Sequence, residues 1–296
     1  MEKVKKNSPQ AWLLATRPKT LAAGSVPVLV GTALAAHFGQ FNLVPAILCL
    51  IFALLAQIAS NFCNDYFDYI KGTDDEDRLG PARAVASGWI DPKRMLYGTF
   101  AVIALACFFG LGLIYYGGWQ MVVVGVVCVL SLIAYTAGPW PLAYHGLGDL
   151  FVLVFFGFVA VVFTYYLQAQ NFPFLAFVAG AVVGLGAVNI LFINNFRDRI
   201  TDEKSNKKTT IVLLGKNFGK WGYLANGILA CLLCLFFFQE SIWAALFPFL
   251  YLFPHCKTWK TMVAIDHGKE LNVLIGGTSK NLLILGLLLS IGLLLG

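Results

Sequence analysis

Charged residues are scarce in this sequence of 296 residues. Only 12% are Asp, Glu, Lys or Arg and 59% are hydrophobic, whereas soluble domains carry roughly 25% charged residues. A soluble chain of this length could not bury so much apolar surface. The sequence also lacks a Walker loop and a G-x-G-x-x-G motif, so we do not expect it to bind a nucleotide. These absences predict an all-α integral membrane protein.

The few cysteines do not indicate a disulfide framework or a metal site. There are seven, an odd number, and nearly all lie in apolar stretches. Cys231 and Cys234 form a C-x-x-C pair without a His or carboxylate nearby, so we interpret them as small buried residues. The N-terminal segment, 1–19, has a basic start but no sustained apolar core. We therefore expect it to lie at the membrane interface and not to be a cleavable signal.

Nine apolar stretches are long enough to be membrane-spanning helices, each of which needs about 20 residues. Very short connections alternate with long, charged ones. We expect the whole of 20–296 to form one transmembrane domain after the interfacial segment. The predicted spans are 20–37, 43–63, 94–116, 119–137, 147–168, 172–193, 221–238, 241–256 and 279–295.

The positive charges predict the orientation. All 21 Lys and Arg residues fall within 1–19, 64–94, 194–220 and 257–280. With nine spans these four regions lie on one side of the membrane, which the positive-inside rule assigns to the cytoplasm. The net charge of +6 is thus an orientation signal and gives no reason to expect nucleic acid. We expect a multi-pass protein of a bacterial inner membrane with a cytoplasmic N-terminus, because no organelle-targeting segment precedes the first span.

Acidic residues gather in two stretches, at the ends of the second and sixth predicted spans. These are NDYFDYIKGTDDEDR at 64–78 and NNFRDRITDEKSNKK at 194–208, which begin alike. A solvated acidic turn would explain one such cluster. Two clusters with the same opening, 130 residues apart, indicate a shared function.

Helical spacing pairs the aspartates within each stretch. On a continuing helix, Asp65 shares a face with Asp68, and Asp198 shares one with Asp202. Like charges so placed repel, so we expect a counter-cation or a ligand. Carboxylates beside an Asn suit Mg²⁺, which is usually shared with substrate phosphates.

Basic residues are interleaved with these carboxylates, which indicates a metal-bridged diphosphate. Because no nucleotide motif is present, we expect the remainder of that substrate to be a lipid. The basic residues are Lys71, Arg78 and Arg83 in the first stretch and its continuation, and Arg197, Arg199, Lys204, Lys207 and Lys208 in the second.

The two motifs resemble those of the UbiA superfamily of intramembrane prenyltransferases. The first departs from the N-D-x-x-D-x-x-x-D pattern of the 4-hydroxybenzoate enzymes, since position 72 is Gly. It is similar to the 1,4-dihydroxy-2-naphthoate polyprenyltransferase branch, with K-G-[ST]-D followed by D-R-x-G-P-x-R. TRPKTL at 16–21 and RDRITDEKSNKKTT at 197–210 also fit that branch. Its usual Gly-Lys before the Thr is Lys-Lys at 207–208, which leaves open which lysine takes the role.

The resemblance implies a nine-transmembrane-helix UbiA-type bundle with cytoplasmic cap loops. It implies transfer of a polyprenyl group from a polyprenyl diphosphate to 1,4-dihydroxy-2-naphthoate, with loss of CO₂ and diphosphate. The product would be demethylmenaquinol, for menaquinone biosynthesis, and the partners would be these two substrates and membrane lipid. The cofactor would be Mg²⁺, as two ions.

Other functions stay open at this point. The acceptor could be homogentisate, a porphyrin, 4-hydroxybenzoate or a lipid glyceryl phosphate. A secondary transporter is a different class of protein, but its ionisable residues should lie near the bilayer midplane. In this sequence the ionisable residues lie at the ends of the predicted helices, which disfavours a transporter.

The predicted site residues fall into three groups by role. As metal ligands we expect Asn64, Asp65, Asp68, Asp74, Asn194, Asn195, Asp198 and Asp202. As catalytic residues we expect Asp65, Asp68, Asp198, Asp202 and Lys71, with Asp149 positioning or deprotonating the hydroxy-arene. As substrate-binding residues we expect Arg17 and Lys19 for the acceptor carboxylate, together with Asn61, Lys71, Arg78, Arg83, Tyr135, Arg197 and Lys204.

Overall fold

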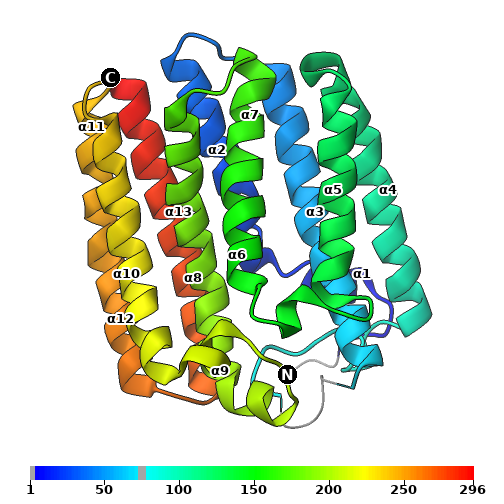
Figure 1. Cartoon of the computed structure of the whole chain (residues 1–296). Coiled ribbons are helices and arrows are strands. Elements are labelled where there is room, and N and C mark those ends of the chain that lie inside the picture. Colours follow the sequence, from blue (N-terminus) through cyan, green and yellow to red (C-terminus); the bar gives the residue numbers. More distant parts are fainter. Residues whose placement is uncertain (1–3, 73–77) are drawn as a thin grey trace.

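Helices dominate the part of the chain that the computed structural model describes, residues 4–72 and 78–296. No strand occurs among these residues, and an isolated β-bridge joins His145 to Lys208. Figure 1 shows the long helices side by side, with the N-terminus and α9 at one end and the C-terminus at the other. A helix satisfies its own backbone polar groups, as hydrocarbon requires. The predicted all-α membrane fold is confirmed.

The helices are α1 (Pro9–Ala15), α2 (Ala22–His37), α3 (Leu43–Ile70), α4 (Pro92–Gly117), α5 (Gln120–Thr136), α6 (Gly148–Val152), the π-helical η3 (Leu153–Val159), α7 (Ala160–Ala169), α8 (Phe174–Lys204), α9 (Thr210–Leu214), α10 (Lys216–Cys234), α11 (Ile242–Leu246), α12 (Leu252–Ile265) and α13 (Asn272–Leu295). Short 3₁₀ turns are η1 (Pro18–Thr20), η2 (Leu142–Tyr144), η4 (Leu235–Phe237), η5 (Phe247–Tyr251) and η6 (Lys269–Leu271).

Six helical stretches in the described ranges are long and apolar enough to cross a membrane. A seventh forms if the bent pair Pro9–Thr20 and Ala22–His37, which meet at 52°, counts as one span. Helix α5 has only 17 residues, and the helices from α11 to α12 are interrupted by a 3₁₀ turn. Each of the nine predicted stretches is largely helical, but the count of nine spans stays a prediction.

The N-terminal segment packs against the bundle. Ala11 and Ala15 of α1 are buried, and the Trp12 ring meets the Phe62 ring of α3 edge-on at 5.3 Å between centroids. Its predicted position at the membrane interface stays a prediction.

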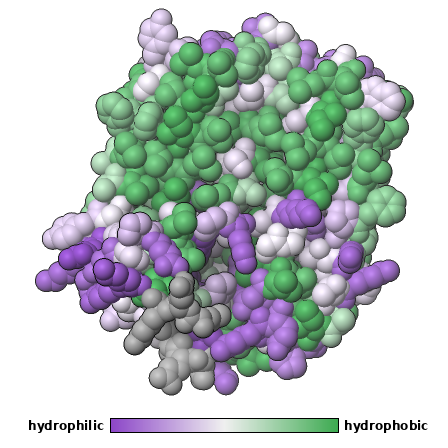
Figure 2. Space-filling model, turned by 180° about the vertical axis from the view of Figure 1, so that it is seen from behind, coloured by the Kyte–Doolittle hydropathy of each residue, from purple (hydrophilic) through white to green (hydrophobic). Residues whose placement is uncertain are grey.

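On the face shown in Figure 2, apolar side chains cover the upper and middle part and polar side chains gather mainly at the lower end. Large side chains such as Phe108 and Phe253 are 66% and 76% exposed. So much exposed apolar surface would be unstable in water and is normal toward lipid. The charged ends of α3 and α8 therefore stand where the apolar surface stops.

Helix α8 lies inside the bundle and approaches η3 closely. A Cβ atom added to Gly157 would lie 2.5 Å from the Gly180 carbonyl oxygen, and one added to Gly184 would lie 3.0 Å from the Leu153 carbonyl oxygen. Only glycine permits such contact, and small residues are how helices pack closely in lipid. This contact holds the first half of α8 against η3.

Candidate functional site

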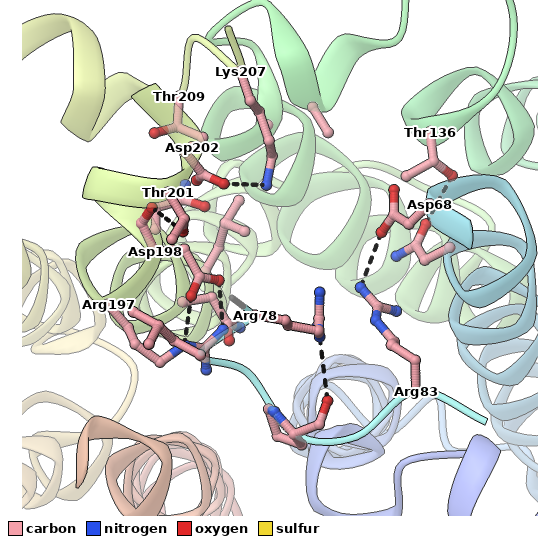
Figure 3. A pocket seen from close by; sticks show the side chains of 18 of the residues that line it. Asp68, Arg78, Arg83, Thr136, Arg197, Asp198, Thr201, Asp202, Lys207 and Thr209 are labelled. Carbon is pink, nitrogen blue, oxygen red and sulfur yellow. Dashed lines mark hydrogen bonds and ion pairs between the residues drawn. The ribbon is translucent and has the colours of Figure 1, made fainter. Parts of the chain in front are cut away.

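A cavity of about 830 Å³ lies at the charged end of the bundle and is lined by both acidic motifs. Asp68 enters it from α3, and Asp198 and Asp202 enter it from α8 (Figure 3). Most of the predicted site residues line this cavity. They are Arg17, Lys19, Asn64, Asp68, Arg78, Arg83, Tyr135, Asp149, Asn194, Asn195, Arg197, Asp198, Asp202 and Lys204.

Asp68 forms a largely buried ion pair in the cavity wall. Its Oδ2 accepts a hydrogen bond from Nη2 of Arg83 at 3.0 Å, and the two side chains are 13% and 9% exposed. Its Oδ1 accepts a hydrogen bond from the Tyr144 hydroxyl at 3.3 Å. Asp68 therefore joins α3 to the loop that carries Arg83 and to the loop after α5.

Asp65, a predicted metal ligand, is bonded to backbone groups in this structure. It is 1% exposed and does not line the cavity. Its two carboxylate oxygens accept hydrogen bonds from the backbone N–H groups of Ala84 and Val85, each at 3.0 Å. Only Asp68 of this predicted pair lines the cavity, and the role of Asp65 as a metal ligand stays a prediction. Asp65 anchors the segment 78–85, which we call the basic loop.

The second motif places its two aspartates on successive turns of α8, each with its own cation. Arg197 donates two hydrogen bonds to Asp198, from Nε to Oδ1 at 2.7 Å and from Nη2 to Oδ2 at 2.5 Å. Lys207 donates from Nζ to Oδ1 of Asp202 at 3.2 Å. The other oxygen of Asp202 is buried without a hydrogen-bond partner.

The predicted lysine of the first motif lies outside the cavity. Lys71 follows α3 and donates from Nζ to the Thr136 carbonyl oxygen at 2.5 Å, so it joins the ends of α3 and α5. Burial lowers the pKa of Lys71, and the carboxylate of Asp68 opposes that shift. Its proposed contact with the substrate has no support in this geometry.

A lysine left out of the predicted site lies inside the cavity instead. Lys207 lines it, near Asp202 and with Nζ 5.7 Å from the centre of the Tyr144 ring. Burial lowers the pKa of Lys207, but Asp202, Asp68 and Asp198 together raise it above its ordinary value. The sequence marked this region only by Lys-Lys at 207–208 in place of the usual Gly-Lys. That pattern did not show which lysine would enter the cavity.

Asp149 and Tyr135 lie together on a further wall of the cavity. Thr210, the first residue of α9, donates its hydroxyl to Oδ2 of Asp149. Oδ1 of Asp149 is buried without a hydrogen-bond partner. An oriented carboxylate with one free oxygen can accept a proton or a hydroxyl hydrogen bond from a bound molecule.

An apolar cavity of about 430 Å³ adjoins the polar one. It extends between α3, α4, α5, η3 and α7, and includes several phenylalanines. Asn61 faces this second cavity and donates from Nδ2 to the Thr16 carbonyl oxygen at 2.9 Å. The residues common to both cavities are Arg17, Thr20, Asn64, Tyr135, Leu191 and Asn194.

The second motif supplies oxygen atoms suited to a divalent cation. Asn194 donates its Nδ2 to the Ile190 carbonyl oxygen at 3.2 Å, which leaves its Oδ1 as a potential ligand. The unpartnered oxygen of Asp202 is a second such atom. Within residues 4–72 and 78–296, no group of three or more His, Cys, Asp or Glu could hold a metal alone. Amide oxygens and a bound anion would have to complete the coordination. Asp74, also predicted as a ligand, lies outside the described residues.

Comparison with known proteins is consistent with this arrangement. The chain is 38% identical over 248 residues to the 1,4-dihydroxy-2-naphthoate octaprenyltransferase of Escherichia coli (strain K12), covering 80% of each chain. It is 33% identical over 298 residues to the protein of the same name from Haemophilus influenzae, covering 96% of each.

Solved structures share the fold at low sequence identity. A UbiA homolog from Aeropyrum pernix K1 superimposes with a TM-score of 0.66 at 16% identity, covering 91% of this chain and 97% of that one. A UbiA homolog from Archaeoglobus fulgidus, bound to DMAPP and Mg²⁺, gives 0.62 at 15%, covering 95% and 99%. Residues 25–272, most of the sequence, match the UbiA prenyltransferase family. The chain belongs to the UbiA prenyltransferase family.

Proposed function

We propose that the chain transfers a polyprenyl group from a polyprenyl diphosphate to 1,4-dihydroxy-2-naphthoate, in menaquinone biosynthesis. Relatives that are 33–38% identical carry the name of this activity. The observation that carries the proposal is the junction of the two cavities. Carboxylates and cations face the polar one, while the adjoining one is apolar, as a diphosphate joined to an isoprenoid chain requires.

The basic groups of the polar cavity would bind the diphosphate. Arg78 and Arg83 enter from the basic loop, and Lys204 and Lys207 enter from the end of α8 and beyond. Guanidinium groups match phosphate oxygens in a planar fork, and an ammonium group acts as a point charge. Together these groups offset negative charge that grows as the C–O bond breaks.

Two Mg²⁺ ions would bind between the motifs and the diphosphate. Asn64 and Asp68 would hold one ion, and Asp198 and Asp202, with Asn194 or Asn195, would hold the other; all six line the polar cavity. When bound, the ions neutralise the charge of the departing diphosphate oxygen.

The remaining chemistry is electrophilic substitution at an aromatic carbon. The allylic C–O bond breaks, a C–C bond forms at the acceptor carbon that bears the carboxylate, and that carboxylate leaves as CO₂. The apolar cavity keeps water from the cation-like carbon. Asp149 would take the proton of the acceptor hydroxyl, and Arg17 or Lys19 would pair with the acceptor carboxylate; all three line the polar cavity.

The active site would face the cytoplasm of a bacterial inner membrane. All four basic regions of the sequence are grouped as the positive-inside rule expects. The polar cavity takes residues from all four of these regions. The N-terminus would then be cytoplasmic too.

The test uses purified protein in lipid, with farnesyl or geranylgeranyl diphosphate and a panel of aromatic acceptors. Each is assayed with Mg²⁺, with EDTA, and with EDTA followed by excess Mg²⁺. We expect a prenylated naphthoquinol lacking the carboxylate, seen by mass spectrometry, only when Mg²⁺ is present. Asp202→Asn should abolish it. Glu240→Gln serves as the control, because Glu240 lies beyond α10, far along the sequence from either motif and outside both cavities.

Three results would contradict parts of the proposal. A product formed only with another acceptor would retain the chemistry and reject the naphthoate. Product formation in EDTA would reject the metal. Intact diphosphate under every condition would reject prenyl transfer.

A further inference from the structure

Two separate anchors hold the basic loop that carries Arg78 and Arg83. At one end, Asp65 of α3 accepts the N–H groups of Ala84 and Val85. At the other end, Asn272 donates from Nδ2 to the Leu79 carbonyl oxygen at 2.8 Å. The loop is thus held between α3 and α13, which are far apart in the sequence.

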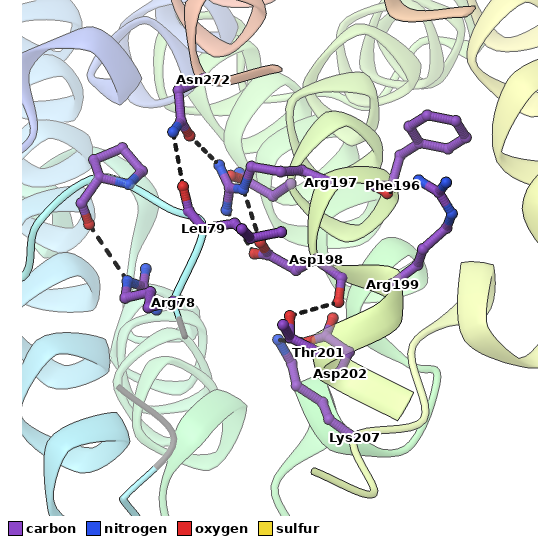
Figure 4. A network of polar contacts seen from close by, with 12 residues as sticks. Arg78, Leu79, Phe196, Arg197, Asp198, Arg199, Thr201, Asp202, Lys207 and Asn272 are labelled. Atoms are coloured by element: carbon purple, nitrogen blue, oxygen red, sulfur yellow. Dashed lines mark hydrogen bonds and ion pairs between the residues drawn. The ribbon is translucent and has the colours of Figure 1, made fainter. Parts of the chain in front are cut away.

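Asn272 also holds the second motif. Its Oδ1 accepts a hydrogen bond from Nη1 of Arg197 at 2.7 Å, as Figure 4 shows. Arg197 is 2% exposed, and its two other guanidinium nitrogens, Nε and Nη2, donate to Asp198. One amide side chain at the start of α13 therefore connects a carbonyl of the basic loop to the arginine that fixes Asp198.

The chemistry of this contact requires an amide. A carbonyl oxygen needs a donor and a guanidinium needs an acceptor, and Asn supplies one of each. The assignment of its nitrogen and oxygen follows from these two partners. Asp at this position would offer only acceptors, and Leu would offer neither.

The basic loop also passes between two guanidinium groups directly after this anchor. A Cβ atom on Gly80 would lie 2.9 Å from Nη2 of Arg197 and 2.9 Å from Nη2 of Arg78. Gly80, the residue after the anchored Leu79, therefore lies close to both guanidinium groups. The anchor and these two cations thus belong to the same part of the site.

We propose that Asn272 is a positioning residue of the diphosphate site. It fixes the position of the basic loop relative to Arg197. The cations of both are therefore in place at the cavity before the substrate binds. The proposal rests on the proposed function, since it assigns Asn272 to the binding of that diphosphate. Preorganised cations lose less entropy when the ligand binds.

The experiment compares Asn272→Leu with Asn281→Leu in lipid nanodiscs. Asn281 lies on the same helix, is 4% exposed, and donates to Thr258 and Pro254 away from both cavities. It therefore controls for the loss of an amide side chain in α13. The readouts are the Kd for geranylgeranyl diphosphate with Mg²⁺, the KM and kcat of prenyl transfer, and hydrogen exchange of the amides of 79–85.

We expect Asn272→Leu to raise the Kd and the KM for the diphosphate by about tenfold, as the loss of a charge-assisted contact implies. It should also speed exchange in 79–85, while Asn281→Leu changes neither. Asn272→Asp keeps the acceptor for Arg197 and loses the donor to Leu79. It should speed the same exchange and weaken binding, and it carries the test if the leucine variant does not fold.

The outcomes separate the two proposals. If the wild type binds the diphosphate and all three variants bind it equally, the positioning role is refuted and the proposed function stands. Equal loss of affinity in the Asn272 and Asn281 variants would make Asn272 merely structural. If the wild type itself does not bind the diphosphate, the proposed function fails and the positioning role fails with it.

Discussion

Asp65 and Asp68 provide a sharp test, because the same substitution at these two positions should differ in its effect on diphosphate binding. Asp65 is buried and accepts two backbone N–H groups of the basic loop. Asp68 faces the cavity beside Arg83. We expect Asp65→Asn to act mainly on stability and Asp68→Asn to act mainly on diphosphate binding.

The magnitude at Asp65 follows from its two bonds. An Asn retains one acceptor oxygen and turns an NH₂ group toward the other backbone donor, so one buried N–H loses its partner. That costs about 1–3 kcal/mol. Asp65→Ala leaves both N–H groups without a partner and should cost about 2–6 kcal/mol. The corresponding falls in Tm are roughly 2–6 °C and 4–12 °C, at about 2 °C per kcal/mol for a chain of this size.

The assay measures Tm in detergent, hydrogen exchange of 79–85, and the Kd for a prenyl diphosphate with Mg²⁺. Asp65→Asn should lower Tm and speed exchange, with a modest rise in Kd because the loop is displaced. Asp68→Asn keeps an acceptor for Arg83 but removes its counter-charge, so it should lower Tm as well; unlike Asp65→Asn, it should lose most of the affinity for the diphosphate. A normal Tm with complete loss of turnover in Asp65→Asn would refute this reasoning and restore Asp65 as a metal ligand.

Three further predictions concern the cations. Gly80→Ala should raise the KM for the diphosphate by about tenfold, because the added Cβ would lie 2.9 Å from Arg197; unchanged kinetics would show that the loop can shift freely. Lys207→Gln should weaken diphosphate binding more than Lys71→Gln, since only Lys207 lines the cavity; the reverse order of Kd values would contradict the structure. Burial lowers the pKa of Lys207, but Asp202 and its neighbouring carboxylates raise it overall. The ion pair between Lys207 and Asp202 is therefore complete below the pKa of an unfolded lysine, about 10.4. It is lost only as the pH rises through the higher pKa of the folded state. The ratio of Kd values between Lys207→Gln and wild type should therefore stay constant from about pH 7 to 10, and a decline centred near pH 9 would contradict the assignment.

Helical spacing predicted the two motifs but could not assign every aspartate within them. Successive helical residues are rotated by about 100°, so Asn64 and Asp65 are each within about 60° of Asp68. Both pairs could share a functional face. The structure selects Asn64 and Asp68 for the cavity, because the partners of Asp65 are backbone groups at positions 84 and 85. Nothing in the local pattern places those groups beside α3.

Contacts between residues distant in the sequence also explain the other differences between the predicted and the observed site. Spans were predictable because apolar length is a local property, and each predicted stretch is largely helical. Lys207 lies beyond the end of α8 and reaches Asp202 only because the chain turns back there. Asn272 was not predicted at all, since it meets Arg197 across 75 positions. Contacts of this kind depend on tertiary packing, which a single sequence does not display.

The charges of the cavity suggest how the bundle can fold before its substrates bind. Three aspartates of the cavity are paired with cations from the chain: Asp68 with Arg83, Asp198 with Arg197, and Asp202 with Lys207. A buried charge without a partner costs about 3–5 kcal/mol, so these pairs keep the empty site from destabilising the protein. Binding of a diphosphate together with divalent cations would exchange partners, since the metal takes carboxylate oxygens and the released cations meet phosphate oxygens. We therefore expect diphosphate and Mg²⁺ to bind with positive coupling, each alone having to compete with an existing ion pair.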